Sequence, residues 1–238
     1  MTSPSTRSAE VHHHHRDVTG GWLRPAVFGV MDGLVSNASL IAGVVGGGAG
    51  AQAVTIAGLA GLAAGAFSMA TGEYTSVRSQ SEMTLAEIAV ERREIARNPE
   101  AEERELALLY ESRGLTPELA GQVAHQLHRR DEVAWRVHAR EELGVDPDDL
   151  PSPWVAAGSS FLAFALGAFV PLLPFLLGFG SVVAAIVLTA AGLFATGAVV
   201  ARLTRRSPVF GGARQLLLGT AAAAVTYGIG HLVGAAIS

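Results

Sequence analysis

The chain has 238 residues, of which 50% are hydrophobic and only 16% are charged, whereas soluble domains carry roughly 25% charged residues. It contains no cysteine, which excludes disulfides, thiolate zinc sites, iron–sulfur clusters and a cysteine nucleophile. The composition therefore predicts an all-α integral membrane protein and disfavours a soluble enzyme.

Windows without charged residues predict where the chain crosses the membrane. They span residues 33–72, 150–201 and 215–238. Since a spanning helix needs about 20 apolar residues, the first two windows each hold two spans and the third holds one. Pro171 and Pro174 are expected to break the third span. The five spans are expected at residues 26–48, 52–77, 154–173, 181–203 and 214–236.

The 17 basic residues, all of them arginine, predict the orientation. Three precede the first span, ten lie between Arg78 and Arg140, and four lie between Arg202 and Arg214. With five spans, all three groups fall on one side, which the positive-inside rule makes the cytoplasm. We therefore place the N-terminus in the cytosol and the C-terminus outside. The bias toward arginine, alanine and glycine indicates a bacterial plasma membrane.

These patterns divide the chain into a cytoplasmic tail (1–21), spans one and two (22–77), a cytoplasmic insert (78–153) and spans three to five (154–238). The insert holds 17 of the 21 acidic residues. We expect three helices in it, too few to bury much core alone, so the insert is expected to pack against a second copy. The first continues span two from Ser79 to Arg97, the second opens at Asn98-Pro99, and the third runs from Thr116-Pro117 to Leu143.

Glutamate pairs make the insert a candidate metal site. Residues three apart lie on one helix face, as do the pairs Glu91/Glu94 and Glu102/Glu105. Together with the imidazole and acids near the end of the third helix, these groups suit Mn²⁺ or Fe²⁺. The alternative is a solvated face, and on the residues alone this is the stronger interpretation. The late candidates are His138, Glu141 and Glu142, and the arginines that would partner a solvated face are Arg92, Arg93, Arg97 and Arg104.

A ferritin-like diiron centre is not expected, because the Glu-x-x-His signature of such centres occurs nowhere in the insert. The run His12–His15 is given no role, and the lone His231 of span five is expected to be structural. We also expect no permanent cofactor, no enzymatic activity and no nucleic-acid partner.

Two acids and a thioether form a second candidate set within the membrane. Asp32 and Glu73 are the only acids in or at the edge of a span, and ionisable groups there are costly unless they have a function. Met69 lies one turn deeper than Glu73. Glu73 could instead reach the headgroups, and Met69 could simply pack. Small residues at four-residue spacing favour a tight seam between proteins along this stripe, which runs through Ala57, Gly61, Gly65, Met69 and Glu73.

Three motifs resemble those of the vacuolar iron transporter family. The first is Met31-Asp32-Gly33-Leu34-Val35-Ser36, followed by Ser39-Leu40. The second is Ala64-Gly65-Ala66-Phe67-Ser68-Met69-Ala70 with Gly72-Glu73-Tyr74. The third includes Ser160-Phe161 and Pro171-Leu172-Leu173-Pro174. The similarity covers about residues 22–238, and the two opening motifs together are specific.

The resemblance implies a five-span homodimer that moves Fe²⁺, often also Mn²⁺, out of the cytosol in exchange for protons, along a path between the protomers. Asp32 and Met69 match the family's pathway residues, and the glutamate pairs match its cytoplasmic ligands, with the last glutamate at Glu142. Where plant members have adjacent Met and Glu, this chain has His138 and Ala139. With the resemblance included, metal binding becomes the preferred interpretation of the pairs.

Two functional hypotheses follow. The preferred one is a secondary transporter, in which the insert captures metal and Asp32, Met69 and Glu73 pass it through the dimer seam, with Fe²⁺, Mn²⁺ or Zn²⁺ as the bound ion. The alternative is a sensor or buffer anchored in the membrane lipid, whose insert binds ions that never cross. Only the transporter needs Asp32 and Met69 buried near a two-fold axis.

Overall fold

The computed structural model describes residues 21–237, and this part of the chain forms eight helices and no strand. The run His12–His15 lies outside the described residues. Five helices have the length and composition to cross a membrane, which confirms the expected all-α fold. They are α1 (Leu23–Gly46), α2 (Ala51–Arg97), α6 (Pro153–Leu176), α7 (Val182–Leu203) and α8 (Pro208–Ile237).

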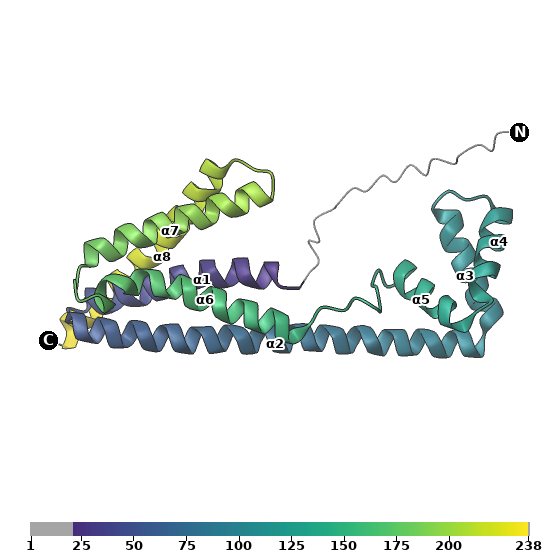
Figure 1. The fold of residues 1–238 in the computed structure, drawn as a ribbon, viewed down its shortest axis with the longest axis horizontal. Coiled ribbons are helices and arrows are strands. Elements are labelled where there is room, and N and C mark those ends of the chain that lie inside the picture. Colours follow the sequence, from purple (N-terminus) through teal and green to yellow (C-terminus); the bar gives the residue numbers. More distant parts are fainter. Residues whose placement is uncertain (1–20, 238) are drawn as a thin grey trace, which may run out of the picture.

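The longest element, α2, continues without a break from the second span into the insert, as the sequence predicted. Its 47 residues correspond to about 70 Å at 1.5 Å per residue, more than twice the roughly 30 Å of a bilayer's hydrocarbon core. Figure 1 shows α2 lying along the whole molecule, with the other spans against one half and the insert against the other. One rigid element therefore connects the membrane bundle to the insert.

The centre of the bundle is the contact between α1 and α6, and α8 packs against both α1 and α7. The backbones of α1 and α6 touch at two glycines. A Cβ atom at Gly33 would overlap the carbonyl oxygen of Phe164, and one at Gly167 would overlap that of Val30. The absence of side chains at these positions thus fixes how closely α1, and with it Asp32, approaches α6.

The expected break at Pro171 and Pro174 is wrong, because α6 continues through both to Leu176. Both prolines lie in the last turns of the helix and are buried among neighbouring helices. Transmembrane helices tolerate proline when neighbours supply the missing donors. The Asn37 side chain of α1 donates to the carbonyl oxygen of Ala168 at 2.6 Å, three residues before Pro171, and so joins α1 to α6 beside this proline.

The insert adds three short helices to the C-terminal half of α2, namely α3 (Pro99–Ser112), α4 (Pro117–His128) and α5 (Asp131–Glu141). The predicted starts at Pro99 and Pro117 are confirmed, and the Thr116 side chain caps α4. Helices α3 and α5 pack on α2, and α4 packs between α3 and α5.

The single third helix predicted for the insert is wrong, because it is divided into α4 and α5. Arg130 has an extended backbone that separates them. The sequence there is Arg-Arg-Asp-Glu, so two cations end α4 and two anions, Asp131 and Glu132, begin α5. Each charge pair complements the dipole of its own helix end, which favours two helices over one and turns α5 back onto α2.

Candidate metal sites

The insert brings three potential ligands together where α5 packs on α2. The Nδ1 atom of His138 lies 2.8 Å from Glu91 Oε1 and 2.8 Å from Glu142 Oε1. One ligand atom from each of the three residues lies within 4.8 Å of the others. His138 is fully buried and Glu91 is 8% exposed. Two oxygens and one imidazole nitrogen thus converge on one point.

The other predicted glutamates surround this point. Glu102 Oε2 is 3.9 Å from His138 Nδ1. Burial, and to a lesser extent the like charges nearby, together raise the pKa of Glu91 to about 7. Burial, followed by the charges of neighbouring carboxylates, also raises the pKa of Glu142 to about 7 and raises the pKa of Glu102. The like charges come from within one set of carboxyl groups, those of Glu91, Glu94, Glu102, Glu105 and Glu142.

His138 is held in the neutral form. Burial, and to a lesser extent the proximity of His128, together lower its pKa to about 4. A neutral imidazole keeps a lone pair for a metal ion, while a cation near the carboxylates would relieve their mutual repulsion. The electrostatics of the cluster therefore favour a divalent cation.

Ion pairs with arginine do not explain why these glutamates lie together. Among the described residues, no arginine lies within ion-pair distance of the five carboxyl groups around His138. Arg92 instead pairs with Glu132 at 3.7 Å and stacks on the Trp135 ring at 4.8 Å. Arg113 binds Glu141, which also accepts a hydrogen bond from Tyr110 at 3.2 Å. The adjacent acids Glu141 and Glu142 therefore have different roles, one in an ion pair and one in the cluster.

One residue near the cluster was missed by the sequence analysis. The rings of His128 and His138 lie edge to face, with centroids 5.0 Å apart. The Nδ1 atom of His128 is 3.3 Å from the carbonyl oxygen of Ala124, and its Nε2 is buried without a partner. His128 ends α4 and His138 lies in α5, so only the unforeseen break between these helices brings the two rings together.

A second group of ligands lines a pocket of about 220 Å³ between α1, α2 and α6. Asp32 and Met69, both predicted, face this pocket together with Ser36 and Ser68. Ser36 Oγ donates to Asp32 Oδ1 at 2.9 Å. Glu73, one turn farther toward the insert, is not among the described residues that line the pocket. The structure thus brings Asp32 and Met69 together and leaves Glu73 apart.

The stripe of small residues on α2 makes its close contacts within the chain, rather than at the seam between proteins that the sequence suggested. A Cβ at Gly61 would overlap Leu40 of α1, and one at Gly65 would overlap the Phe164 ring of α6. Met69 packs against the same small cluster as Phe164. The stripe therefore seats α2 on α1 and α6 and places Met69 at the pocket.

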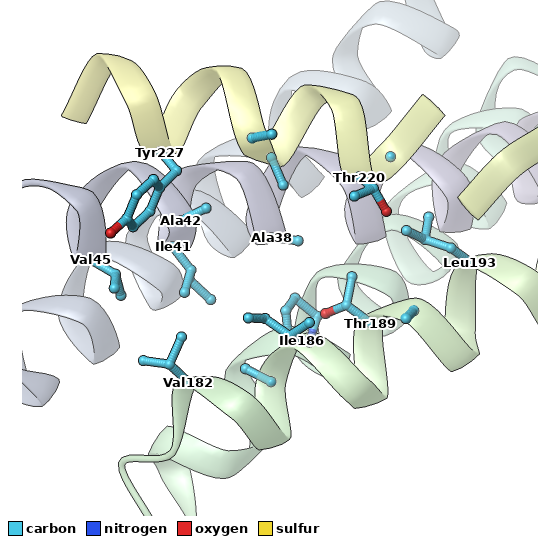
Figure 2. Close-up of a pocket in the computed structure, with 16 residues that line it drawn as sticks. Ala38, Ile41, Ala42, Val45, Val182, Ile186, Thr189, Leu193, Thr220 and Tyr227 are labelled. Carbon is cyan, nitrogen blue, oxygen red and sulfur yellow. The ribbon is translucent and has the colours of Figure 1, made fainter. Parts of the chain in front are cut away.

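A further cavity, of about 290 Å³, lies between α1, α7 and α8 (Figure 2). Its lining is apolar except for the hydroxyl groups of Thr189, Thr220 and Tyr227. Because it contains no carboxylate, imidazole or thioether, it offers none of the groups that bind divalent metal ions strongly. The two clusters described above remain the candidate metal sites.

Comparison with known proteins shows the family to which this chain belongs. Residues 23–231 match the sequence pattern of the VIT family. The chain belongs to the VIT family. It is 39% identical over 230 residues to the vacuolar iron transporter of Acanthamoeba castellanii, covering 90% of this chain and 79% of that protein. Vacuolar iron transporter 1 of Arabidopsis thaliana is 30% identical over 234 residues, covering 97% and 94%.

The VIT match extends across the insert as well as the spans. Its bounds include Asp32 and Met69 in the bundle and Glu91, His138 and Glu142 in the insert. The VIT family vacuolar iron transporter homolog 1 of A. thaliana is 34% identical over 221 residues, covering 90% of this chain and 84% of that protein. The resemblance inferred from the motifs is therefore confirmed.

Proposed function

We propose that this protein is a secondary transporter that exports Fe²⁺, and also Mn²⁺, from the cytosol in exchange for protons. Membership of the VIT family supports iron as the cargo, because the relatives are vacuolar iron transporters. The ligand chemistry supports both ions, since carboxylate, imidazole and thioether groups together suit Fe²⁺ and Mn²⁺ better than Mg²⁺ or Ca²⁺.

The observation that carries the proposal is that α2 bears ligands of both candidate sites. Met69 lies in its membrane half and Glu91 in its insert half. They are 22 residues apart, which corresponds to about 33 Å along the helix. In our proposal the insert captures cytosolic metal, and Asp32 and Met69 then hold it within the bilayer. Glu73 lies at the entrance, between the insert and the pocket.

Proton exchange follows from the same ligands. A carboxylate that binds a metal ion must first lose its proton, so metal binding releases protons and acid releases metal. The pKa values of Glu91 and Glu142, both about 7, place this competition near cytosolic pH. A proton gradient across the membrane can then drive the metal outward.

We further propose that the protein works as a homodimer in a bacterial plasma membrane, with its N-terminus in the cytosol. An unpartnered apolar face of α2 supports the dimer, since Ile56 is 61% and Phe67 is 65% exposed. Thr71, Gly72, Thr75 and Ser76 are exposed next to them and allow close approach of a second helix. The Asp32 pocket adjoins this face through Ser68.

Flux measurements separate the transporter from a sensor or buffer. Purified full-length protein is reconstituted into liposomes, and uptake of Fe²⁺ and Mn²⁺ is measured with and without a pH gradient. A transporter moves both ions, faster when the gradient favours exchange. A sensor or buffer binds metal in detergent but shows the same uptake as liposomes without protein, and that result would overturn the proposal.

A further inference from the structure

The buried amide group of Asn37 lines the same pocket as Asp32 and Met69 but is not among the proposed metal ligands. Asn37, one turn along α1 from Asp32, is 2% exposed. It lines the pocket that contains Asp32 and Met69. Asparagine is seldom this buried without a specific role, because an unpaired amide group loses its hydrogen bonds to water.

The orientation of this amide is fixed. Its Nδ2 donates to the carbonyl oxygen of Ala168 at 2.6 Å. Rotating the amide by half a turn would place Oδ1 against that carbonyl oxygen, which is repulsive. The nitrogen therefore anchors the side chain to α6, and Oδ1 must point away from α6.

The oxygen has no partner. Asn37 Oδ1 is buried and accepts no hydrogen bond from the described residues. Leaving such an acceptor unsatisfied is energetically costly, so a buried oxygen of this kind calls for an explanation. Two other polar residues of α1 that line the pocket, Asp32 and Ser36, are hydrogen-bonded to each other.

The space in front of the oxygen is kept open by a glycine of α2. A Cβ atom at Gly61 would lie 3.0 Å from Asn37 Oδ1. Gly61 also lines the pocket. A side chain at this position would therefore contact Oδ1.

From this geometry we infer that Asn37 Oδ1 is a direct ligand of the metal ion that occupies the membrane pocket. The inference rests on the proposed function, because it names a further ligand of the same pocket. The amide oxygen is a hard, neutral donor that suits Fe²⁺ and Mn²⁺. It adds a bond without adding a charge, so it helps to replace the hydration shell while leaving the ion free to depart.

The test replaces Asn37 with leucine, which has similar size and no oxygen. Initial rates of Fe²⁺ uptake into liposomes are measured for full-length Asn37→Leu over a range of concentrations. We expect KM to rise about tenfold or more, the loss typical when a metal site loses one supporting group. The melting temperature without metal should fall by no more than a few degrees, because removing an unsatisfied oxygen offsets the lost bond to Ala168.

Ser39→Ala is the matched control. Ser39 is also buried on α1 with an unpartnered oxygen, yet it is not among the described residues that line the pocket. Its removal should leave KM unchanged. An unchanged KM in folded Asn37→Leu would overturn the inference. So would an equal rise in Ser39→Ala, because both polar groups would then act only through packing.

A second pair of variants leaves Asn37 in place and decides the matter if Asn37→Leu does not fold. Gly61→Ala places a methyl group 3.0 Å from Oδ1 and against Leu40, whereas Gly58→Ala places one on the same helix against Leu172, and Gly58 is not among the described residues that line the pocket. Only Gly61→Ala should raise KM. Equal KM values for the two alanine variants would refute the inference.

Failure of the proposed function gives a different result. If wild-type protein moves no metal, the proposed transport is wrong, and ligation is then read from Mn²⁺ binding to full-length protein by electron paramagnetic resonance. His138→Ala and Glu142→Gln are combined there to remove the insert's contribution. Asn37→Leu in this background should weaken the remaining binding about tenfold, and unchanged binding would overturn the ligand assignment.

Discussion

The insert cluster and the membrane pocket both include residues of α2, and they differ in the number of charged groups that they contain. The cluster gathers five carboxyl groups around one buried imidazole, with Glu91 and Glu142 each 2.8 Å from His138. The pocket combines one carboxylate, one thioether and neutral oxygens. Many carboxylates hold a scarce cation strongly, whereas a path must bind an ion weakly enough to release it. The difference therefore fits capture in the insert and passage in the bilayer.

The largest expected effect comes from removing Asp32, the only charged residue among the described residues that line the pocket. Asp32→Asn should reduce Fe²⁺ and Mn²⁺ uptake into liposomes to the level without protein, because no other anion in the pocket replaces the ion's hydration shell. Binding to the insert should persist, since Asp32 lies on α1 in the membrane bundle, whereas His138 lies on α5 in the insert. Near-normal flux in this variant would show that the pocket is not on the path.

The second effect tests the insert as the site of capture. Changing Glu91, Glu94, Glu102 and Glu105 together to Gln should remove most metal binding measured by calorimetry, while flux is reduced but not abolished. The control changes Glu87, Glu100, Glu111 and Glu118 to Gln, which alters the net charge equally in the same segment. If both quadruple variants lose binding equally, general electrostatic attraction explains the insert.

The third effect is the pH dependence of metal binding by the insert. The pKa values of Glu91 and Glu142 are both about 7, so each is mostly protonated at about pH 6 and mostly ionised at about pH 8. Affinity should therefore fall about hundredfold between about pH 8 and about pH 6, roughly tenfold for each displaced proton. Glu142→Gln should reduce the fall to about tenfold.

The same pKa values predict the stability of the metal-free protein. Because folding raises the pKa of Glu91 and Glu142, protons bind the folded form more tightly, and this stabilisation is lost as pH rises through about 7. Folding lowers the pKa of His138, so this residue destabilises the folded form as pH falls. That contribution is felt only below its usual pKa of 6.5. Between about pH 6.5 and about pH 8 the metal-free melting temperature should fall, and added Mn²⁺ should reverse the fall. A metal-free melting temperature that rises over this range would contradict these pKa shifts.

The smallest effect concerns the choice between metals. Met69→Ala should slow Fe²⁺ uptake several-fold more than Mn²⁺ uptake, because the thioether is the softest ligand in the pocket. Met83→Ala is the control, since Met83 lies on the same helix and is 70% exposed. Equal losses for both ions in Met69→Ala would leave Met69 with a packing role only.

Much of the fold could be predicted from the sequence because its signals are local. Charge-free windows placed the five spans, and Pro99 and Pro117 marked helix starts in the insert. The continuity of α2 followed from a stretch rich in strong helix formers. By contrast, the hydrogen bond from Asn37 to Ala168, beside Pro171, joins residues 131 positions apart, and no local pattern shows such a partner.

The candidate sites were predictable only in part, for a related reason. Pair spacing identified Glu91 and Glu102, yet spacing did not distinguish Glu141 from Glu142, and only the family resemblance favoured Glu142. Arg113 made that distinction, through an ion pair across the fold. Asn37 was missed because its importance lies in an oxygen without a partner, which only the surrounding packing shows.

The unbroken course of α2 also makes the helix a lever. A stiff helix transmits a change of tilt along its whole length, and Glu91 lies about 33 Å from Met69 at 1.5 Å per residue. A tilt of about 5° about Met69 would therefore move Glu91 by about 3 Å. That displacement is comparable to the 2.8 Å that separates Glu91 from His138. Movements too small to notice within the bilayer would thus suffice to open or close the ligand cluster at the far end.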